Sequence, residues 1–151
     1  CSVGMEITGE HKVPASQEAT YDAMLDPEVL KGALPGCERL EEVGENEYVA
    51  TMTIGVAMIK GKYDGKVKIT DLNRPNSFTM HIEGKGPQGQ LSGVGDLTFE
   101  AIDENNTLVK YRGDANVRGM LARIGARVVQ PATKMIVGKF FDEMTSQMKK
   151  A

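Results

Sequence analysis

The residues between Lys60 and Thr70 alternate strictly between two kinds, and this pattern limits the possible folds more than any other feature of the chain. The polar positions are Lys60, Lys62, Asp64, Lys66, Lys68 and Thr70, and the apolar or small positions are Gly61, Tyr63, Gly65, Val67 and Ile69. Successive side chains of a strand point to opposite faces of a sheet, so the pattern predicts a strand with one face in water. We therefore expect an antiparallel sheet with one solvated face.

Further segments with the same period of two surround this strand. The clearest are 6–13, 48–58, 78–83, 97–101 and 107–117, with turns at residues 73–76 and 103–106. Two short helices are predicted before residue 35, one capped by Ser16 and the next by Asp26. Pro35-Gly36 then makes a turn.

The remainder, from Met120 to about Met148, has helical periodicity and predicts one long helix of about 29 residues. Its first apolar stripe consists of Leu121, Ile124, Gly125, Val128, Ala132, Met135 and Ile136. A second stripe, turned by more than a quarter turn, consists of Val137, Phe140, Phe141, Met144 and Met148. Either Pro131 and Gly138 bend the helix so that both stripes reach one sheet, or the end contacts something else.

These elements predict an α+β fold in which a curved antiparallel sheet of about seven strands grips a long C-terminal helix. The length of 151 residues suits a single domain over residues 5–151, with residues 1–4 as an extension ahead of it. Ile54 to Ile59 is the longest apolar run and is too short to cross a bilayer, so we expect a cytoplasmic protein. Cys1 and Cys37 lie in no metal-binding pattern and predict free thiols without zinc.

Charge is distributed unevenly along the chain. Residues 1–50 contain 11 acids and 3 bases, whereas residues 118–151 contain 2 acids and 7 bases. An acidic first third does not suit a nucleic-acid-binding protein. The basic end suits contact with an anionic surface.

A curved sheet with one helix across its concave face leaves an apolar cavity, which is the candidate ligand site. Methionines predicted to face inward (Met52, Met58, Met80, Met120 and Met135) favour an elongated lipid-like guest, although each also suits ordinary core packing. The predicted lining residues are Met52, Ile54, Val56, Tyr63, Phe78, Met80, Leu91, Leu97, Phe99, Leu121, Ile124, Val128 and Met135.

Two surfaces are candidates for partner or membrane contact. The first is the row Lys60, Lys62, Lys66 and Lys68, for which protection of an edge strand is the alternative explanation. The second is the end of the last helix at Phe140, Phe141 and Met144, for which packing inside the protein is the alternative.

The segment Gly84-Lys85-Gly86-Pro87-Gln88-Gly89 matches a dinucleotide-binding pattern but lies between predicted strands and opens no helix, so it does not predict nucleotide binding. Its glycines allow the paired strands to bend and to approach the helix closely, and they also leave room for a ligand.

Catalysis is not predicted: His11 suits a hydrogen-bonded core position, and Cys37 suits a structural turn. The glutamates between residues 38 and 47 suit a solvated turn, or a docking patch for a basic partner.

Several stretches resemble the carbon monoxide dehydrogenase G-subunit family of the START-like (SRPBCC), helix-grip superfamily, from about Met5 to Gln147. The matching stretches are Asp26-Pro27-Glu28-Val29-Leu30, Leu34-Pro35-Gly36-Cys37-Glu38, Lys60-Gly61-Lys62-Tyr63-Asp64-Gly65-Lys66-Val67, Glu83-Gly84-Lys85-Gly86 and Phe140-Phe141. The resemblance implies a non-catalytic accessory protein of a molybdenum-containing carbon monoxide dehydrogenase or related hydroxylase. It also implies a bound quinone or other lipophilic molecule and a peripheral position on the inner face of the cell membrane.

Two other functions remain open at this point. The chain could be a module that recruits an enzyme to the membrane through protein contacts, with an incidental cavity. It could also be an enzyme of the cyclase or hydrolase kind, in which His11 would be the residue to test.

Overall fold

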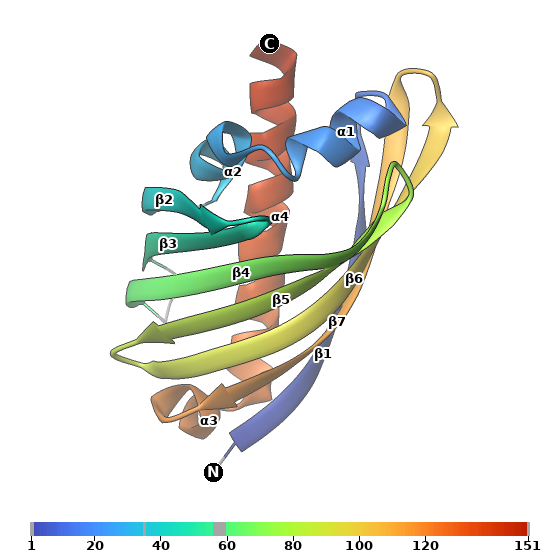
Figure 1. Cartoon of the computed structure of the whole chain (residues 1–151). Helices are drawn as coiled ribbons and strands as arrows, with labels where there is room; N and C mark the ends of the chain where they lie inside the picture. Colours follow the sequence, from blue (N-terminus) through green and yellow to red (C-terminus); the bar gives the residue numbers. More distant parts are fainter. Residues whose placement is uncertain (1, 35, 56–59, 151) are drawn as a thin grey trace.

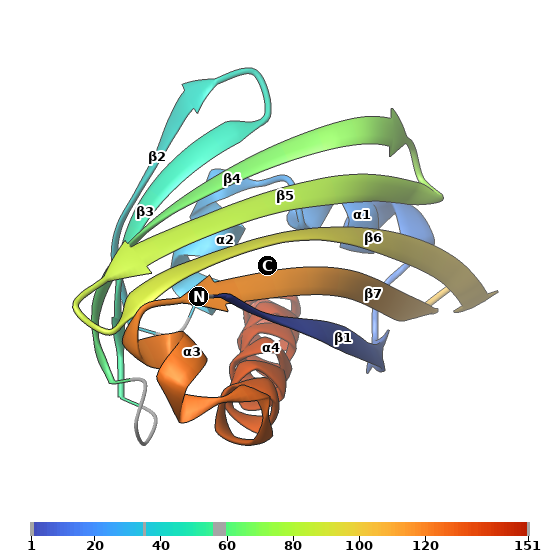
Figure 2. The ribbon, with the colours of Figure 1, turned by 90° about the horizontal axis from the view of Figure 1, so that it is seen from below.

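The fold is a seven-stranded antiparallel sheet wrapped around a long helix, as Figures 1 and 2 show. The computed structural model describes residues 2–34, 36–55 and 60–150. The strands are β1 (Ser2–Val13), β2 (Cys37–Gly44), β3 (Glu47–Ile54), β4 (Gly61–Asn73), β5 (Ser77–Gly86), β6 (Gly89–Asp103) and β7 (Asn106–Arg118). The helices of the described residues are α1 (Gln17–Ala23), α2 (Pro27–Ala33), α3 (Met120–Ile124) and α4 (Ala126–Lys150). The predicted α+β class and the curved sheet gripping a C-terminal helix are confirmed.

The strand order in the sheet is β1-β7-β6-β5-β4-β3-β2. The first strand therefore pairs with the last strand, with Met5 opposite Ala115 and Val13 opposite Thr107. Residues 2–4 continue this pairing instead of standing outside the fold. β4 lies third from the β2 edge, so the lysine row does not protect an edge strand, and that interpretation was wrong.

The two short helices form where the caps predicted them. The Ser16 hydroxyl accepts a hydrogen bond from the Ala19 amide at 3.2 Å, and the Asp26 carboxylate accepts one from the Glu28 amide at 2.9 Å. Each cap accepts a hydrogen bond from an amide at the start of its helix, and Pro27 has no amide N–H that would need an acceptor in the first turn. The helices cover one end of the concave face (Figure 1).

The single C-terminal helix predicted from residue 120 is interrupted. Gly125 has a φ of 91°, which ends α3 and starts α4 one residue later. Such a backbone conformation favours glycine because it lacks a Cβ. Pro131 lies inside α4 without ending it. Its missing amide removes only the bond to Arg127, in the first turn of the helix.

Side chains from both halves of α4 and the concave face of the sheet build two separate core clusters. The α1 cluster consists of Val13, Tyr21, Ala23, Met24, Leu30, Ala33, Tyr48, Ile69, Phe78, Leu97, Phe99, Val109, Phe141 and Met144. The α3 cluster consists of Met5, Ile7, Ile54, Val117, Leu121, Val129 and Ala132. The first half of α4 therefore packs in the α3 cluster and the second half in the α1 cluster. Both apolar stripes of the helix thus pack against the same sheet, although one is rotated relative to the other.

Candidate functional site: a hollow between two core clusters

The concave face between the two clusters is lined by small residues. Ala50, Gly65 and Gly84 are successive partners across β3, β4 and β5. On β6 and β7, Gly93 pairs with Ala115 and Gly95 pairs with Gly113. Because alternate residues of a strand share a face, all of these positions lie on the side of the apolar Val67, Ile82 and Val117. The middle of the concave face therefore carries almost no side chains.

Open space lies above this band at Gly84 and Gly65, whereas a Cβ at Gly93 or Gly113 would come within 3.1 Å of a backbone oxygen. A Cβ at Gly84 would meet no heavy atom within 4 Å, and one at Gly65 would meet only backbone oxygens, at 3.6 Å and 3.9 Å. On α4, Gly138 is likewise free of neighbours within 4 Å. Ile82, although on the concave face, is 37% exposed. We call this space, between Gly65, Gly84 and Ile82, the central hollow.

Apolar side chains that are only partly buried surround the central hollow. Val67 and Met80 border it from the α1 cluster, and Met52 and Leu91 border it from the α3 cluster. Thioether and branched aliphatic side chains adapt to apolar guests of different shape. A site of this composition would bind an apolar ligand by removing apolar surface from water. This removal contributes a free energy of roughly 25 cal/mol per Å² of buried apolar surface.

Two half-buried phenols, Tyr63 and Tyr111, lie on the concave face. Tyr111 packs against both clusters, and a Cβ at Gly9 would overlap its hydroxyl, so Gly9 is needed for this ring position. Burial raises the pKa of both Tyr111 and Tyr63 above the ordinary value of 10.0, so both stay protonated at neutral pH. In the part of the chain that the structure describes, the Tyr111 hydroxyl forms no hydrogen bond. It can donate one to a carbonyl oxygen of a ligand.

His11 lies beside this site but not in a catalytic arrangement. Its imidazole stacks on Phe141 with 4.6 Å between ring centroids, and Tyr111 stacks at 6.1 Å. Within the described residues it makes ring contacts and no hydrogen bond, so the predicted hydrogen-bonded core histidine is a stacked one instead. No described hydroxyl or thiol uses it as a base, whereas nucleophilic catalysis needs that contact.

The predicted lining residues separate into four groups, of which the last, Val128 and Met135, lies on α4. Met52, Tyr63, Met80, Leu91 and Ile124 are half-buried around the hollow. A second group is packed inside the clusters with 9% exposure or less and offers a ligand no free surface, contrary to prediction: Ile54, Phe78, Leu97, Phe99 and Leu121. Val56, and with it the inward-facing Met58, lies outside the described residues.

Three predicted inward positions on the C-terminal segment are corrected by the structure. Met120 is 50% exposed and Met135 is 52% exposed, so both point away from the core. Val128 is half-buried and belongs to neither cluster, while its neighbour Val129 is 2% exposed. Because Gly125 divides this segment into two helices, a projection onto a single unbroken helix places these residues wrongly.

The aromatic end of α4 is part of the core. Phe141 is 3% exposed, Met144 is fully buried, and Phe140 packs partly buried against them. Val137 and Met148 pack against the same cluster. The packing alternative for this stripe is therefore the correct one, and Phe141 and Met144 have no surface to offer to a membrane.

The lysine row lies on the outer face of the sheet, turned away from α4. Lys62 pairs with Glu38 at 3.2 Å, and Lys68 pairs with Glu47 at 3.5 Å. Lys60 and Lys66 are exposed and form no ion pair within the described residues. Both side chains of each ion pair are exposed to water, so each pair contributes little to the stability of the fold.

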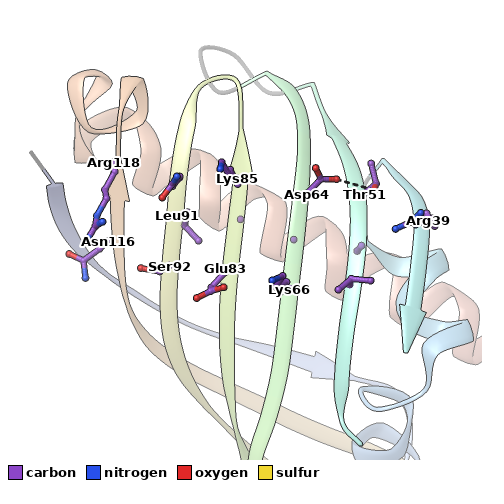
Figure 3. A pocket seen from close by; sticks show the side chains of 15 residues that line it. Arg39, Thr51, Asp64, Lys66, Glu83, Lys85, Leu91, Ser92, Asn116 and Arg118 are labelled. Atoms are coloured by element: carbon purple, nitrogen blue, oxygen red, sulfur yellow. Dashed lines mark hydrogen bonds between the residues drawn. The ribbon is translucent and has the colours of Figure 1, made fainter. Parts of the chain in front are cut away.

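Lys66 belongs to a shallow polar hollow of about 710 Å³ on this outer face, shown in Figure 3. Its other charged lining residues are Arg39, Asp64, Glu83, Lys85 and Arg118. Four cations against two acids make the lining weakly positive. Val49, Ala50, Gly65, Gly84 and Leu91 also line it. The exposed charges around them suit a protein partner.

The glycine motif at residues 84–89 forms a hairpin between β5 and β6 and opens no helix, as predicted. Gly86 lies under the Tyr63 ring, where a Cβ would come within 2.5 Å of Cδ2. Gly84, two residues earlier, faces open space. The predicted close approach therefore occurs at Gly86, and Gly84 borders open space. Cys37 begins β2 with its thiol donating to the Arg39 carbonyl, and burial raises its pKa, which suits a structural role.

Sequence reasoning missed the residues that form the floor of the central hollow. Strand alternation places Gly65, Ile82 and Tyr111 on the inward face, but a search for large apolar side chains does not select them as a site. The signal was available, because Gly65 and Gly84 are positions without a side chain in adjacent predicted strands. Their cross-strand pairing could not be known from the sequence.

Comparison with known proteins agrees with this architecture. A sequence model of the carbon monoxide dehydrogenase G-subunit (CoxG) family matches residues 9–149. A conserved protein from Geobacillus kaustophilus is similar at 29% identity and a TM-score of 0.92, over 97% of this chain and 96% of that one. No functionally curated protein matches the sequence significantly.

More distant structures share the fold alone. The aromatase/cyclase Zhui from Streptomyces sp. R1128 has 13% identity and a TM-score of 0.71, over 98% of this chain and 95% of its own. Truncated norcoclaurine synthase from Thalictrum flavum has 17% identity and a TM-score of 0.68, over 97% and 94%. Among the described residues, no helix is long and apolar enough to cross a membrane.

Proposed function

The chain belongs to the CoxG family of carbon monoxide dehydrogenase subunits, and from this premise we propose that it is a non-catalytic accessory protein that carries a quinone in its central hollow. Its partner would be a molybdenum-containing carbon monoxide dehydrogenase or related hydroxylase in the cytoplasm. By carrying the quinone between this enzyme and the inner face of the cell membrane, it would link the two.

The observation that supports this proposal most directly is the open space at Gly84 inside an apolar surround. A well-packed core holds few voids of this kind, because unfilled space forfeits dispersion contacts. The open space over Gly65 and Gly84 lies beside Met80 and Leu91 and suits a flexible apolar chain. The isoprenoid chain of the quinone would lie against Met80 and Leu91.

Mass spectrometry of an organic extract tests the proposal. The protein is purified from a quinone-producing host, extracted, and measured beside a native spectrum of the intact chain. A stoichiometric quinone supports the proposal. An empty protein that also fails to bind added decylubiquinone in a fluorescence titration would overturn it.

The alternative, a recruiting module that acts through protein contacts, is favoured by the polar outer hollow of Figure 3. Lys66 and Lys85 lie there without ion-pair partners among the described residues, free to meet acids of a partner. Under this alternative, K66E/K85E abolishes binding of the dehydrogenase while the quinone content is unchanged. The matched control is K12E/K110E, which reverses the same number of charges on β1 and β7.

A further inference from the structure

Three segments meet at the end of the molecule that carries α3. The Leu121 amide of α3 donates to the Gln88 carbonyl in the β5–β6 turn at 2.8 Å. The Gln88 side chain in turn reaches the Lys60 carbonyl, just ahead of β4, at 3.5 Å. Figure 2 shows α3 beside the β5–β6 turn and the start of α4. We call this region the α3 end.

Charge at the α3 end is mainly positive, although Glu38, Asp64 and Glu83 lie beside it. Residues 60–63, 84–94 and 118–130 contain no aspartate or glutamate. They contain six cations: Lys60, Lys62, Lys85, Arg118, Arg123 and Arg127. All six are exposed, and in the described part of the chain only Lys62 forms an ion pair.

The opposite end of the sheet is acidic. α1 and the β4–β5 and β6–β7 turns place Glu18, Asp22, Asp71, Asp103 and Glu104 there, with Arg74 held by Asp22. The molecule therefore has a charge dipole along its strands. Such a dipole orients the α3 end toward a negatively charged surface.

The α3 end also exposes apolar surface beside its cations. Met120, the first residue of α3, is 50% exposed, and Pro87 in the neighbouring turn is exposed. Its inner side is formed by Leu121 and Ile124 of the α3 cluster, which walls the central hollow. A basic surface with an exposed apolar side chain is what interfacial membrane binding requires.

From these observations we infer that the α3 end is a docking surface for an anionic lipid bilayer. This inference rests on the proposed function in one respect. A carried quinone has to pass between protein and bilayer without crossing water, and it can do so when the wall of its site faces the membrane. This requirement favours a bilayer over an acidic protein as the occupant. Arg118, Arg123 and Arg127 would contact lipid phosphates while Met120 enters the interface.

Co-sedimentation with vesicles tests the inference. The full chain is mixed with vesicles of phosphatidylglycerol and phosphatidylcholine, and separately with phosphatidylcholine alone, at low and high salt. We expect binding to the anionic vesicles only, weakened by salt. Neutralising one cation should cost about five-fold in affinity, so R123Q/R127Q should lose about 25-fold. M120Q should weaken binding without changing the salt dependence.

The control K12Q/K110Q removes the same net charge elsewhere and should bind within about two-fold of the unmodified protein. Equal losses in both double variants would overturn the inference, since net charge alone would then explain binding. Equal binding to neutral vesicles, or binding to immobilised polyglutamate but not to vesicles, would also overturn it. Decylubiquinone titration of the unmodified protein separates the two proposals: quinone binding without binding to anionic vesicles contradicts only the docking surface, and vesicle binding without quinone binding contradicts only the carrier function. R123Q/R127Q should keep the quinone affinity of the unmodified protein.

Discussion

Gly65 of β4 and Gly84 of β5 are direct cross-strand partners on the face of the sheet that looks toward α4. Two adjacent residues without side chains expose backbone where a core would normally place apolar groups. The energetic cost is lost packing and lost rigidity of the strands. The same pair creates the space that a ligand can occupy.

The first prediction concerns filling this space. G84L places a side chain where no heavy atom lies within 4 Å, so the fold should keep its stability or gain up to about 1 kcal/mol from reduced freedom of the unfolded chain. Decylubiquinone affinity should fall more than tenfold. The control E83L adds the same side chain one residue away on the outer face. Unchanged quinone binding by folded G84L would contradict the assigned site.

The second prediction concerns the turn between α2 and β2. Gly36 has a φ of 66°, and a Cβ there would lie 1.9 Å from the Thr53 carbonyl oxygen. G36A should therefore lower the free energy of unfolding by about 1–3 kcal/mol. Urea denaturation followed by circular dichroism measures the loss. G55A, at a position with nothing within 4 Å, is the comparison, and equal effects of the two variants would refute the argument.

The third prediction concerns the aromatic end of α4. F141A removes a ring that is 3% exposed and stacked on His11, so we expect destabilisation by about 3–5 kcal/mol. F140A should cost less because Phe140 is only half-buried. Both values come from chemical denaturation. A loss below about 1 kcal/mol for F141A would mean that this end of α4 is not anchored in the core.

The fourth prediction concerns acid stability. Arg74 donates from Nε and Nη2 to the two carboxylate oxygens of Asp22, at 2.8 Å each, and so joins the β4–β5 turn to α1. These hydrogen bonds lower the pKa of Asp22 below its ordinary value of 3.8. A carboxylate with a lowered pKa stabilises the folded state above its unfolded pKa, and this contribution disappears as pH falls through the folded value.

The variant D22N should therefore be slightly less stable than the unmodified protein at pH 7, and the difference should vanish near pH 2–3. The effect is small because both side chains are about half exposed. Thermal unfolding between pH 2 and 7 measures it. E18Q, a carboxylate on the same helix outside this ion pair, serves as the control. A constant difference across the whole range would show that Asp22 acts through something other than its charge.

Much of the fold could be predicted because its signals are local. The alternation from Lys60 to Thr70 depends only on the period of a strand, and Ser16 and Asp26 cap helices that begin within three residues of them. The turn at Gly36 could be predicted from its Pro-Gly sequence, although the close approach of the Thr53 carbonyl could not. The assignment of His11 and Tyr111 to the inward face likewise needed only strand alternation.

The sequence by itself therefore determined the strands, the first two helices, their order and the inward faces of the strands, since each follows from contacts between near neighbours along the chain. Tertiary structure alone decided that β4 is internal, that Gly125 divides the last helix and exposes Met120 and Met135, and that Phe78 and Phe99 fill one end. It also decided that Gly65 meets Gly84. These outcomes depend on register and packing between residues distant in sequence, and the open space that makes the candidate site exists only once they are set.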